Sequence, residues 1–230
     1  MKFKQGIKVA VDAVVFGYSN SQLQVLLIKQ KYGELKDQWA LVGGFVKNEE
    51  SLSEAVKREL SEEASVSINY LEQLYTFGDD VNRDPRGHTI SVAYFALVDA
   101  AKLVPIAGSD AQEAQWYPVS HLPELAFDHK HIIEFALKRL RSKLTYEPIG
   151  FDLLPREFPF SDLENLYCSI LGCEIDRRNF RKKILSFGLL EETAKFSSNK
   201  SGRPAKLFKF NKKKYGTLVK NGFIFEIDFA

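Results

Sequence analysis

The feature that most constrains this chain is the run GFVKNEESLSEAVKRELSEEASV at residues 44–66, in which glycine, arginine and glutamate stand at fixed distances from one another. Six residues set the spacing: Gly44, Glu50, Arg58, Glu59, Glu62 and Glu63. A charged run of this length is ordinarily a solvated acidic helix. The joint match of six positions, placed between a glycine pair and a helical pattern, instead indicates a functional site.

The same run predicts where a helix begins and which side of it is buried. Ser51 is followed three residues later by Glu54, which predicts a capping box at the helix start, just after the loop of Gly43 and Gly44. The apolar residues then fall at helical spacing on one face: Leu52, Ala55, Val56 and Leu60. We therefore expect an amphipathic helix that packs this face against a core.

Three glutamates of this helix are expected to lie close together. Glu59, Glu62 and Glu63 occupy positions i, i+3 and i+4, so their carboxylates share one face and repel each other unless a cation lies among them. Hard divalent ions such as Mg²⁺ take oxygen ligands of this kind and keep water ligands for a phosphate-bearing partner. Arg58 lies four residues before Glu62 and is expected to hold that carboxylate in place.

This spacing resembles the Nudix box. The resemblance implies the Nudix fold, an α/β (α+β) architecture in which helices flank a mixed sheet. One position departs from the family pattern, because Ser65 stands where the family has a second glycine. That residue ends the helix, where a glycine would relieve a left-handed conformation, so the departure concerns the exit turn and not the carboxylates.

Apolar runs and turn residues on both sides of the box predict the remaining elements of a first domain over residues 1–145. The expected strands cover residues 7–16, 23–29, 39–45, 70–77, 89–98 and 115–118, and an amphipathic helix covers residues 129–144. The loop before residue 89 carries Arg83 and Arg86, whose planar forks suit a phosphate or sugar, although a simple polar loop is an equal alternative. We interpret Asp128 as a helix cap followed by two ordinary histidines, His129 and His131.

Residues 146–159 contain prolines and a glycine and break all periodicity, which predicts a linker before a second domain at residues 160–230. Ser161 and Glu164 predict a capping box, and Asp176 is expected to cap a second, basic helix. Two short strands then flank the tip KFSSNKSGRPAK. Helix, turn, basic helix and hairpin in this order are typical of a winged helix-turn-helix.

Charge is concentrated in that second domain. The whole chain carries only +2, but residues 176–214 contain 13 basic and three acidic residues, a net +10, so the remainder carries −8. We expect a basic helix and wing to contact duplex DNA, with Asn179 pairing to adenine and Arg203 entering a narrow minor groove. The alternative is a basic appendage used for solubility or for docking to another protein. The predicted DNA-binding residues are Arg177, Arg178, Asn179, Arg181, Lys182, Lys200, Arg203 and Lys206.

A Nudix domain followed by a winged helix resembles one family, the NrtR-like Nudix-related transcriptional regulators. The resemblance covers essentially the whole chain and rests on GGF at 43–45, RDPRG at 83–87, ISVAY at 90–94, LAFDH at 125–129, RNFRKK at 178–183 and GRPAKLFKF at 202–210. It implies a ligand-responsive regulator that binds palindromic DNA operators as a homodimer. The effector would be ADP-ribose or a pentose such as arabinose.

The resemblance also assigns roles in the first domain. The implied catalytic residues are Arg58, Glu59, Glu62 and Glu63, and the implied ligand-binding residues are Gly43, Gly44, Phe45, Arg83 and Arg86. Because the box carboxylates are retained, the alternative is a Mg²⁺-dependent hydrolase of ADP-ribose or a related nucleoside diphosphate derivative with an accessory winged helix. In that case Glu59 and Glu63 would hold Mg²⁺. Effector, operator and the sign of regulation stay open at this stage.

No apolar run approaches the length of a membrane span, and the start of the chain lacks a cleavable small-residue site. We therefore expect a cytoplasmic protein with no membrane partner.

Overall fold

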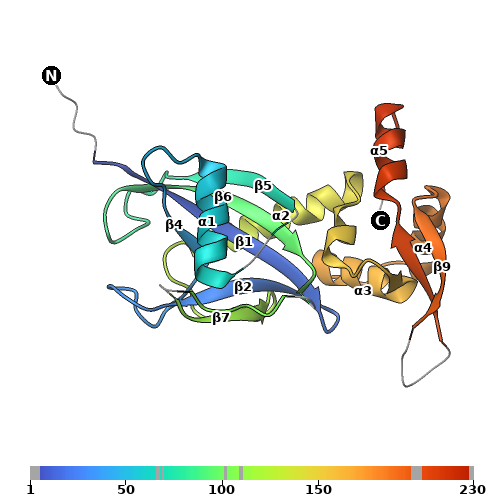
Figure 1. Ribbon diagram of the computed structural model, residues 1–230, viewed down its shortest axis with the longest axis horizontal. Helices are drawn as coiled ribbons and strands as arrows, with labels where there is room; N and C mark the ends of the chain where they lie inside the picture. Colours follow the sequence, from blue (N-terminus) through green and yellow to red (C-terminus); the bar gives the residue numbers. More distant parts are fainter. Residues whose placement is uncertain are drawn as a thin grey trace. The chain divides into compact units, whose positions relative to one another are not determined.

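The computed structural model describes residues 6–65, 68, 70–100, 103–108, 111–197 and 204–227. The chain forms two compact units (Figure 1). The first comprises residues 1–17 and 24–137, and the second comprises residues 18–23 and 138–230. The boundary lies within helix α2 (His129–Tyr146), earlier in the chain than the predicted boundary at residue 145.

The first unit is built on a mixed sheet, as predicted, and this sheet has seven strands where the sequence predicted six. Its strands are β1 (Lys8–Ser19), β2 (Gln22–Gln30), β3 (Trp39–Ala40), β4 (Val42–Phe45), β5 (Tyr70–Phe77), β6 (Thr89–Val98) and β7 (Ala111–Pro118). The central order is β3-β2-β1-β6-β5, with β4 paired to β1 and β7 to β2. Strands β1 and β6 are parallel and both are buried along most of their length, which explains their near-continuous apolar sequences.

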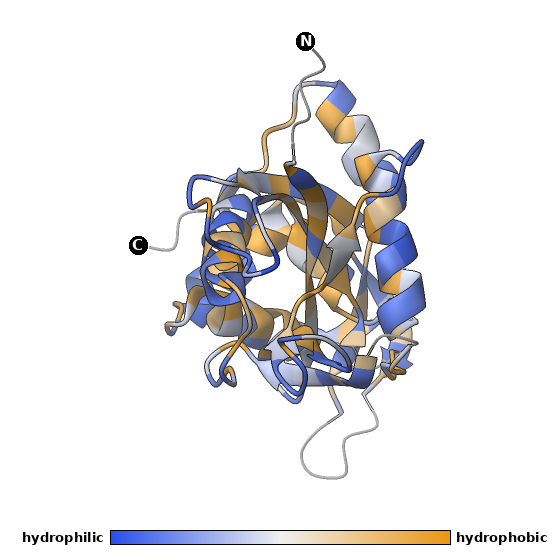
Figure 2. Cartoon of the chain, turned by 90° about the vertical axis from the view of Figure 1, so that its left-hand side faces the viewer, coloured by the Kyte–Doolittle hydropathy of each residue, from blue (hydrophilic) through white to orange (hydrophobic). Residues whose placement is uncertain are grey.

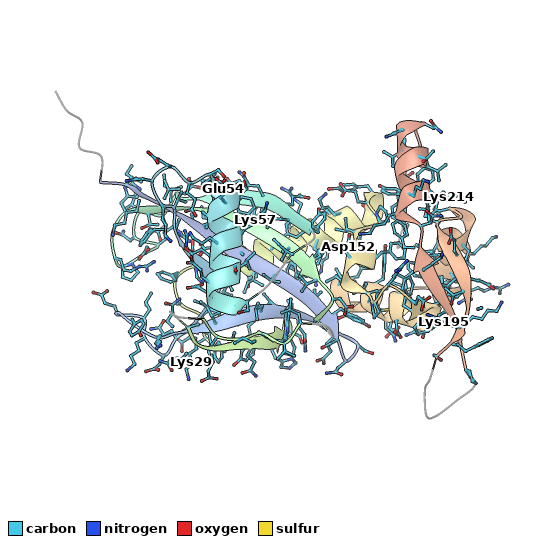
Figure 3. The ribbon with its side chains drawn as sticks, in the orientation of Figure 1. Lys29, Glu54, Lys57, Asp152, Lys195 and Lys214 are labelled. Atoms are coloured by element: carbon cyan, nitrogen blue, oxygen red, sulfur yellow. The ribbon has the colours of Figure 1, made fainter. Side chains whose placement is uncertain are left out.

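Helix α1 (Leu52–Ala64) carries the box and covers one face of this sheet (Figure 1). The predicted capping box is confirmed, because Ser51 and Glu54 satisfy each other's backbone N–H groups. Leu60 is fully buried against the sheet, and burial of a leucine side chain stabilises a fold by about 1.5–3 kcal/mol. Ser65 ends the helix in the left-handed conformation at φ 53°, as predicted. The exposed side of the helix carries Glu54 and Lys57, which are labelled in Figure 3.

The end of α1 is closed by a loop that a larger residue would push away. The backbone N–H of Gly108 donates to the carbonyl of Glu63 at 3.0 Å. A Cβ on Gly108 would lie 1.6 Å from the carbonyl oxygen of Glu62, so only glycine allows this approach. Figure 2 shows hydrophobic stretches on the central strands and hydrophilic stretches on the surrounding loops, in keeping with a core on the sheet.

The second unit is a winged helix, as predicted. Its elements after α2 are a 3₁₀ helix η2 (Ile149–Leu153), β8 (Phe158–Pro159), α3 (Phe160–Leu171), α4 (Arg177–Ser186), β9 (Leu190–Phe196), β10 (Lys206–Phe210) and α5 (Lys212–Lys220). The three strands form an antiparallel sheet in the order β8-β10-β9. Aromatic rings from α3, α4 and β10 meet in the core, where Phe160 lies 6.2 Å from Phe180 and 5.8 Å from Phe208.

Two predictions for this unit differ from the structure. The predicted capping box of Ser161 and Glu164 is wrong: Pro159 is the N-cap of α3 and makes no side-chain cap, because strand β8 runs directly into the helix. Residues 146–159, predicted to be a linker, lie within the second unit, where Phe151, Leu153 and Phe158 are buried. Proline and glycine interrupt helical periodicity there, and the exposed residues of the stretch are Tyr146, Pro155 and Arg156. None of the helices in the described ranges has the length and apolar character needed to cross a bilayer.

Candidate functional site

A cavity of about 580 Å³ lies in the first unit, where β1, β4 and α1 meet the loop after β5. All nine residues predicted for the first domain's site line it: Gly43, Gly44, Phe45, Arg58, Glu59, Glu62, Glu63, Arg83 and Arg86. The cavity is also lined by Asp12, Asp84, Phe127 and His129, which the sequence analysis did not assign to it.

Arg58 ties the box carboxylates together. Its Nε and Nη2 donate to the two oxygens of Glu50 at 2.7 and 3.0 Å, and its Nη1 donates to Glu59 at 2.6 Å. The predicted contact with Glu62 is confirmed at 3.2 Å. Nη2 also donates to the carbonyl of Phe45 at 3.2 Å, which fixes the guanidinium against β4. The hydrogen bonds from Arg58 lower the pKa of Glu50 to about 2.

The glycine pair lets two carboxylates lie against the backbone. The N–H of Gly43 donates to Glu63 Oε2 at 3.1 Å. A Cβ on Gly44 would lie 2.2 Å from Glu59 Oε1, so a side chain at this position would displace the Glu59 carboxylate. Glu59 is only 8% exposed, and burial raises its pKa above the ordinary value although Arg58 acts in the opposite direction. A buried carboxylate of this kind is stabilised by a cation.

The donor set of this cluster suits a hard divalent ion, because all its ligands are carboxylate oxygens. In this structure Arg58 already contacts two of the carboxylates, Glu59 and Glu62. Across the part of the chain that the structure describes, no three acidic, histidine or cysteine side chains are grouped so as to hold a metal ion. Glu59 and Glu63 are the buried carboxylates nearest the glycine pair, and their oxygens are donors of the kind that a hard divalent ion takes.

A second layer of buried polar groups lies beneath the carboxylates. Asp12 is the only charged residue within β1's buried run; Ser91 donates to it, and His129 Nε2 lies 3.4 Å from its carboxylate. The N–H of Leu41 donates to His129 Nδ1 at 2.9 Å, which leaves Nε2 to face Asp12. Burial raises the pKa of Asp12, but His129, Ser91 and Arg83 together bring it below the ordinary value.

The two predicted arginines of the loop, Arg83 and Arg86, differ in burial and in hydrogen-bond partners. Arg83 is buried, with its Nε donating to Asp128 at 2.9 Å and its Nη2 3.6 Å from Asp12. The carboxylate of Asp128, which we interpreted as a helix cap, is thus bonded to Arg83. Arg86 is 45% exposed at its side chain and is held by Asp84 through bonds of 3.0 and 2.9 Å.

The guanidinium of Arg86 contacts two aromatic rings. Its carbon lies 4.9 Å from the ring centres of both Phe45 and Phe127. Phe127 has φ 55°, a left-handed conformation that costs a residue of this kind about 1–3 kcal/mol. The fold retains this strain at a residue that lines the cavity, which makes Phe127 a candidate ligand contact. The LAFDH segment contained it, but no local pattern indicated where its ring would lie.

The second unit places the predicted DNA-binding residues on helix α4 and the wing. Arg177 donates to Asn165 at 3.2 Å and lies 3.7 Å from Glu164, so it is tied to α3. The side chain of Asn179 donates to the helix cap Asp176 at 2.7 Å. These contacts hold the start of the helix in place.

The remaining predicted residues fall into three groups. Arg181 stacks over the ring of Phe160 at 4.3 Å, and Lys206 on β10 pairs with Glu192. Arg178 and Lys182 are exposed. Lys200 and Arg203, at the predicted wing tip, lie outside the described residues.

Both units match known families. Residues 7–135 match the NUDIX domain, and residues 150–210 match the NrtR DNA-binding winged helix domain. The chain is similar to the "ADPR responsive transcriptional repressor NtrR" of Acinetobacter baylyi, at 34% identity over 204 residues that cover 87% of this chain and 80% of the relative. It is also similar to an ADP-ribose pyrophosphatase of Methanocaldococcus jannaschii, at 40% identity over 126 residues that cover 55% of this chain and 70% of the relative.

Solved structures agree with these matches. The structure of Shewanella oneidensis NrtR complexed with a 27mer DNA is 33% identical, with a TM-score of 0.74 and coverage of 88% of this chain and 93% of the other. The NUDIX domain of the same protein complexed with ADP ribose is 37% identical, with a TM-score of 0.54 and coverage of 59% and 90%. The chain therefore belongs to the NrtR family of Nudix-related transcriptional regulators, in which a Nudix domain precedes a DNA-binding winged helix.

Proposed function

We propose that this protein is a homodimeric transcriptional regulator whose Nudix domain binds ADP-ribose as effector and whose winged helix binds a palindromic operator. The observation that carries the proposal is the joint presence of an intact carboxylate cavity and a winged helix with a net charge of +10 over residues 176–214. The names of the Acinetobacter and Shewanella relatives support both ligands. We also propose a cytoplasmic location, which the similarity to a transcriptional repressor and to a DNA-bound regulator supports.

The cavity offers complementary groups to each part of ADP-ribose. The exposed face of Arg86, with Phe45 and Phe127 beside it, suits a planar base or a phosphate oxygen. The carboxylates of α1 repel a pyrophosphate, so that part of the ligand requires a cation. We infer that Glu59 and Glu63 hold Mg²⁺ there.

Mg²⁺, when bound, neutralises the carboxylates, polarises the pyrophosphate and activates a water molecule. The chain's own residues provide the positioning. Arg58 fixes Glu59 and Glu62, and Gly44 leaves room for the Glu59 carboxylate against β4. Asp12 and His129 support the floor of the cavity, where Asp12 accepts from Ser91 and His129 Nδ1 accepts from the N–H of Leu41.

A second candidate function is Mg²⁺-dependent hydrolysis of ADP-ribose. It is favoured by the retention of Arg58, Glu59, Glu62 and Glu63 in one cavity and by the similarity to an ADP-ribose pyrophosphatase. We expect turnover to be weak or absent, since a sensor that destroyed its effector would report poorly on it. Purified protein incubated with Mg²⁺ and ADP-ribose tests this. A turnover of about 1 per second or more would make the protein an ordinary enzyme, and its loss in Glu63→Gln would assign the activity to this cavity.

The regulator itself is tested by titrating duplex DNA with and without ligand. An effector that acts allosterically changes operator affinity by a factor of roughly 5–150. We expect ADP-ribose to do so and arabinose not to. DNA binding that neither ligand alters would remove the sensor role, and an effect of arabinose alone would replace ADP-ribose as the effector.

Oligomeric state is the remaining part of the proposal. Helix-turn-helix proteins read two half-sites about one helical turn apart with a two-fold symmetric dimer. Light scattering of the free protein and of its complex with a palindromic duplex is expected to give the mass of a dimer. A monomer in both samples contradicts the proposal.

A further inference from the structure

The basic residues of α4 divide into those that the fold uses and those that it leaves free. Arg177 and Asn179 are bonded to α3 and to the helix cap, and Arg181 stacks on Phe160. Arg178 and Lys182 are exposed, and among the described residues their side chains make no hydrogen bond, ion pair or ring contact. Free cations of this kind are available to a ligand.

A third residue, Leu185, lies on the same side of the helix as the two free residues Arg178 and Lys182. Arg178, Lys182 and Leu185 lie at i, i+4 and i+7 and therefore form one row. Phe180 and Ile184 point into the core, which leaves this row on the exposed side. At 1.5 Å per residue the row spans about 10 Å, roughly three base-pair steps of B-DNA.

Leu185 is the unusual member of the row. It is 40% exposed on a helix whose other outward residues are charged or polar, although Ile184 beside it is buried. An apolar side chain in that position presents part of its surface to solvent. In the major groove, the apolar group that it would meet is the C5-methyl of thymine.

We propose that Arg178, Lys182 and Leu185 form the base-reading row of α4, while Arg177, Asn179 and Arg181 position the helix. Arg178 and Lys182 would donate to the O6 and N7 acceptors of guanine, and Leu185 would contact a thymine methyl. In this assignment Asn179 holds the helix start through its bond to Asp176, in place of the adenine contact expected from the sequence. The inference rests on the proposed DNA-binding function and names the residues that determine its specificity.

The experiment begins by selecting the preferred duplex from a randomised library with the full-length protein. Affinities are then measured for that duplex, for copies with one thymine replaced by deoxyuridine, and for copies with one guanine replaced by 7-deazaguanine. Deoxyuridine removes only the C5-methyl group, and 7-deazaguanine removes only the N7 acceptor. Each probe therefore deletes one atom group that the row is proposed to contact.

When deoxyuridine replaces one particular thymine of each half-site, wild-type protein is expected to lose about fourfold in affinity. A loss of this size corresponds to the burial of one methyl group. Leu185→Ala should bind the thymine and deoxyuridine duplexes equally at that position. Arg178→Ala should likewise be insensitive to 7-deazaguanine at one guanine to which the wild type is sensitive. If every modified position affects wild type and Leu185→Ala equally, the role of Leu185 is refuted.

A matched pair of lysines controls for charge. Lys182→Ala and Lys183→Ala remove the same charge from adjacent positions, but Lys183 lies over the ring of Phe187 and outside the row. Of these two lysine variants, only Lys182→Ala should change the base preference recovered from the library. A change with Lys183→Ala overturns the assignment. A wild-type protein that enriches no sequence at all refutes the proposed function itself, and circular dichroism of each variant excludes misfolding.

Discussion

Paired and free arginines have different roles, as Arg58 and Arg83 of the first unit and Arg178 of the second unit illustrate. In the first unit, Arg58 donates hydrogen bonds to three glutamates and a carbonyl, and Arg83 is 4% exposed at its side chain between Asp128 and Asp12. In the second unit, Arg178 is exposed and carries no partner among the residues that the structure describes. Paired arginines hold a site together, whereas free arginines attract an anionic partner. Composition alone does not separate the two roles.

The largest expected effect is the loss of a paired arginine. Arg83→Ala leaves the buried Asp12 and the Asp128 carboxylate without their cation, and removing one partner of a buried pair costs about 3–5 kcal/mol. The free energy of unfolding can be followed in urea by tryptophan fluorescence, since Trp39 and Trp116, the two tryptophans, both lie in the first unit. A variant as stable as the wild type would show that the pairing has no structural role.

Arg86 tests whether an exposed arginine of the first unit behaves like those of the second. Arg86→Lys keeps a charge near Asp84 but loses the planar face between Phe45 and Phe127. We expect ADP-ribose affinity to fall about fivefold, in line with roughly 1 kcal/mol for a cation–ring stack, while unfolding in urea stays close to wild type. Calorimetric titration measures the affinity for ADP-ribose. Unchanged affinity would place the ligand elsewhere in the cavity.

The carboxylates around Arg58 should respond to pH in opposite directions. The pKa of Glu50 is lowered to about 2, so its contribution to stability is present above its unfolded value near 4.5 and is lost as pH falls toward 2. Burial raises the pKa of Glu59, so its contribution is present below about 4.5 and is lost as pH rises through the folded value. Melting temperatures are measured from pH 2 to 7. In Glu50→Gln, the fall in melting temperature that the wild type shows toward pH 2 is expected to be lost. In Glu59→Gln, the melting temperature near pH 7 is expected to be higher than that of the wild type. Identical profiles would contradict both assignments.

The smallest expected effect is on a free arginine. Arg178→Ala should change stability by no more than about 0.5 kcal/mol, as for surface positions without contacts. Arg181→Ala on the same helix should cost slightly more, about 0.5–1 kcal/mol, because it loses the stack on Phe160. Thermal unfolding followed by far-UV circular dichroism compares the two. A larger loss in Arg178→Ala than in Arg181→Ala would reverse the assignment of roles.

Local chemistry made much of this protein predictable. The capping box of Ser51 and Glu54, the buried face of α1 and the left-handed Ser65 each depend on neighbours within one or two turns. The strands of the mixed sheet and the order of the winged helix follow from apolar runs and turn residues. The Nudix family could be recognised for the same reason, since its box lies within one short segment.

The tertiary structure decided what depends on residues far apart in the chain. Asp12, Ser91 and His129 meet only because β1 pairs with β6 and α2 begins beside them. Arg83 and Arg86 are three residues apart, yet distant partners bury one and leave the other exposed. On α4 the sequence alone determined a basic helix, whereas contacts with α3 and the aromatic core decided which basic side chains are left free. Periodicity reports the face of an element, but the partner of each side chain is set by long-range packing.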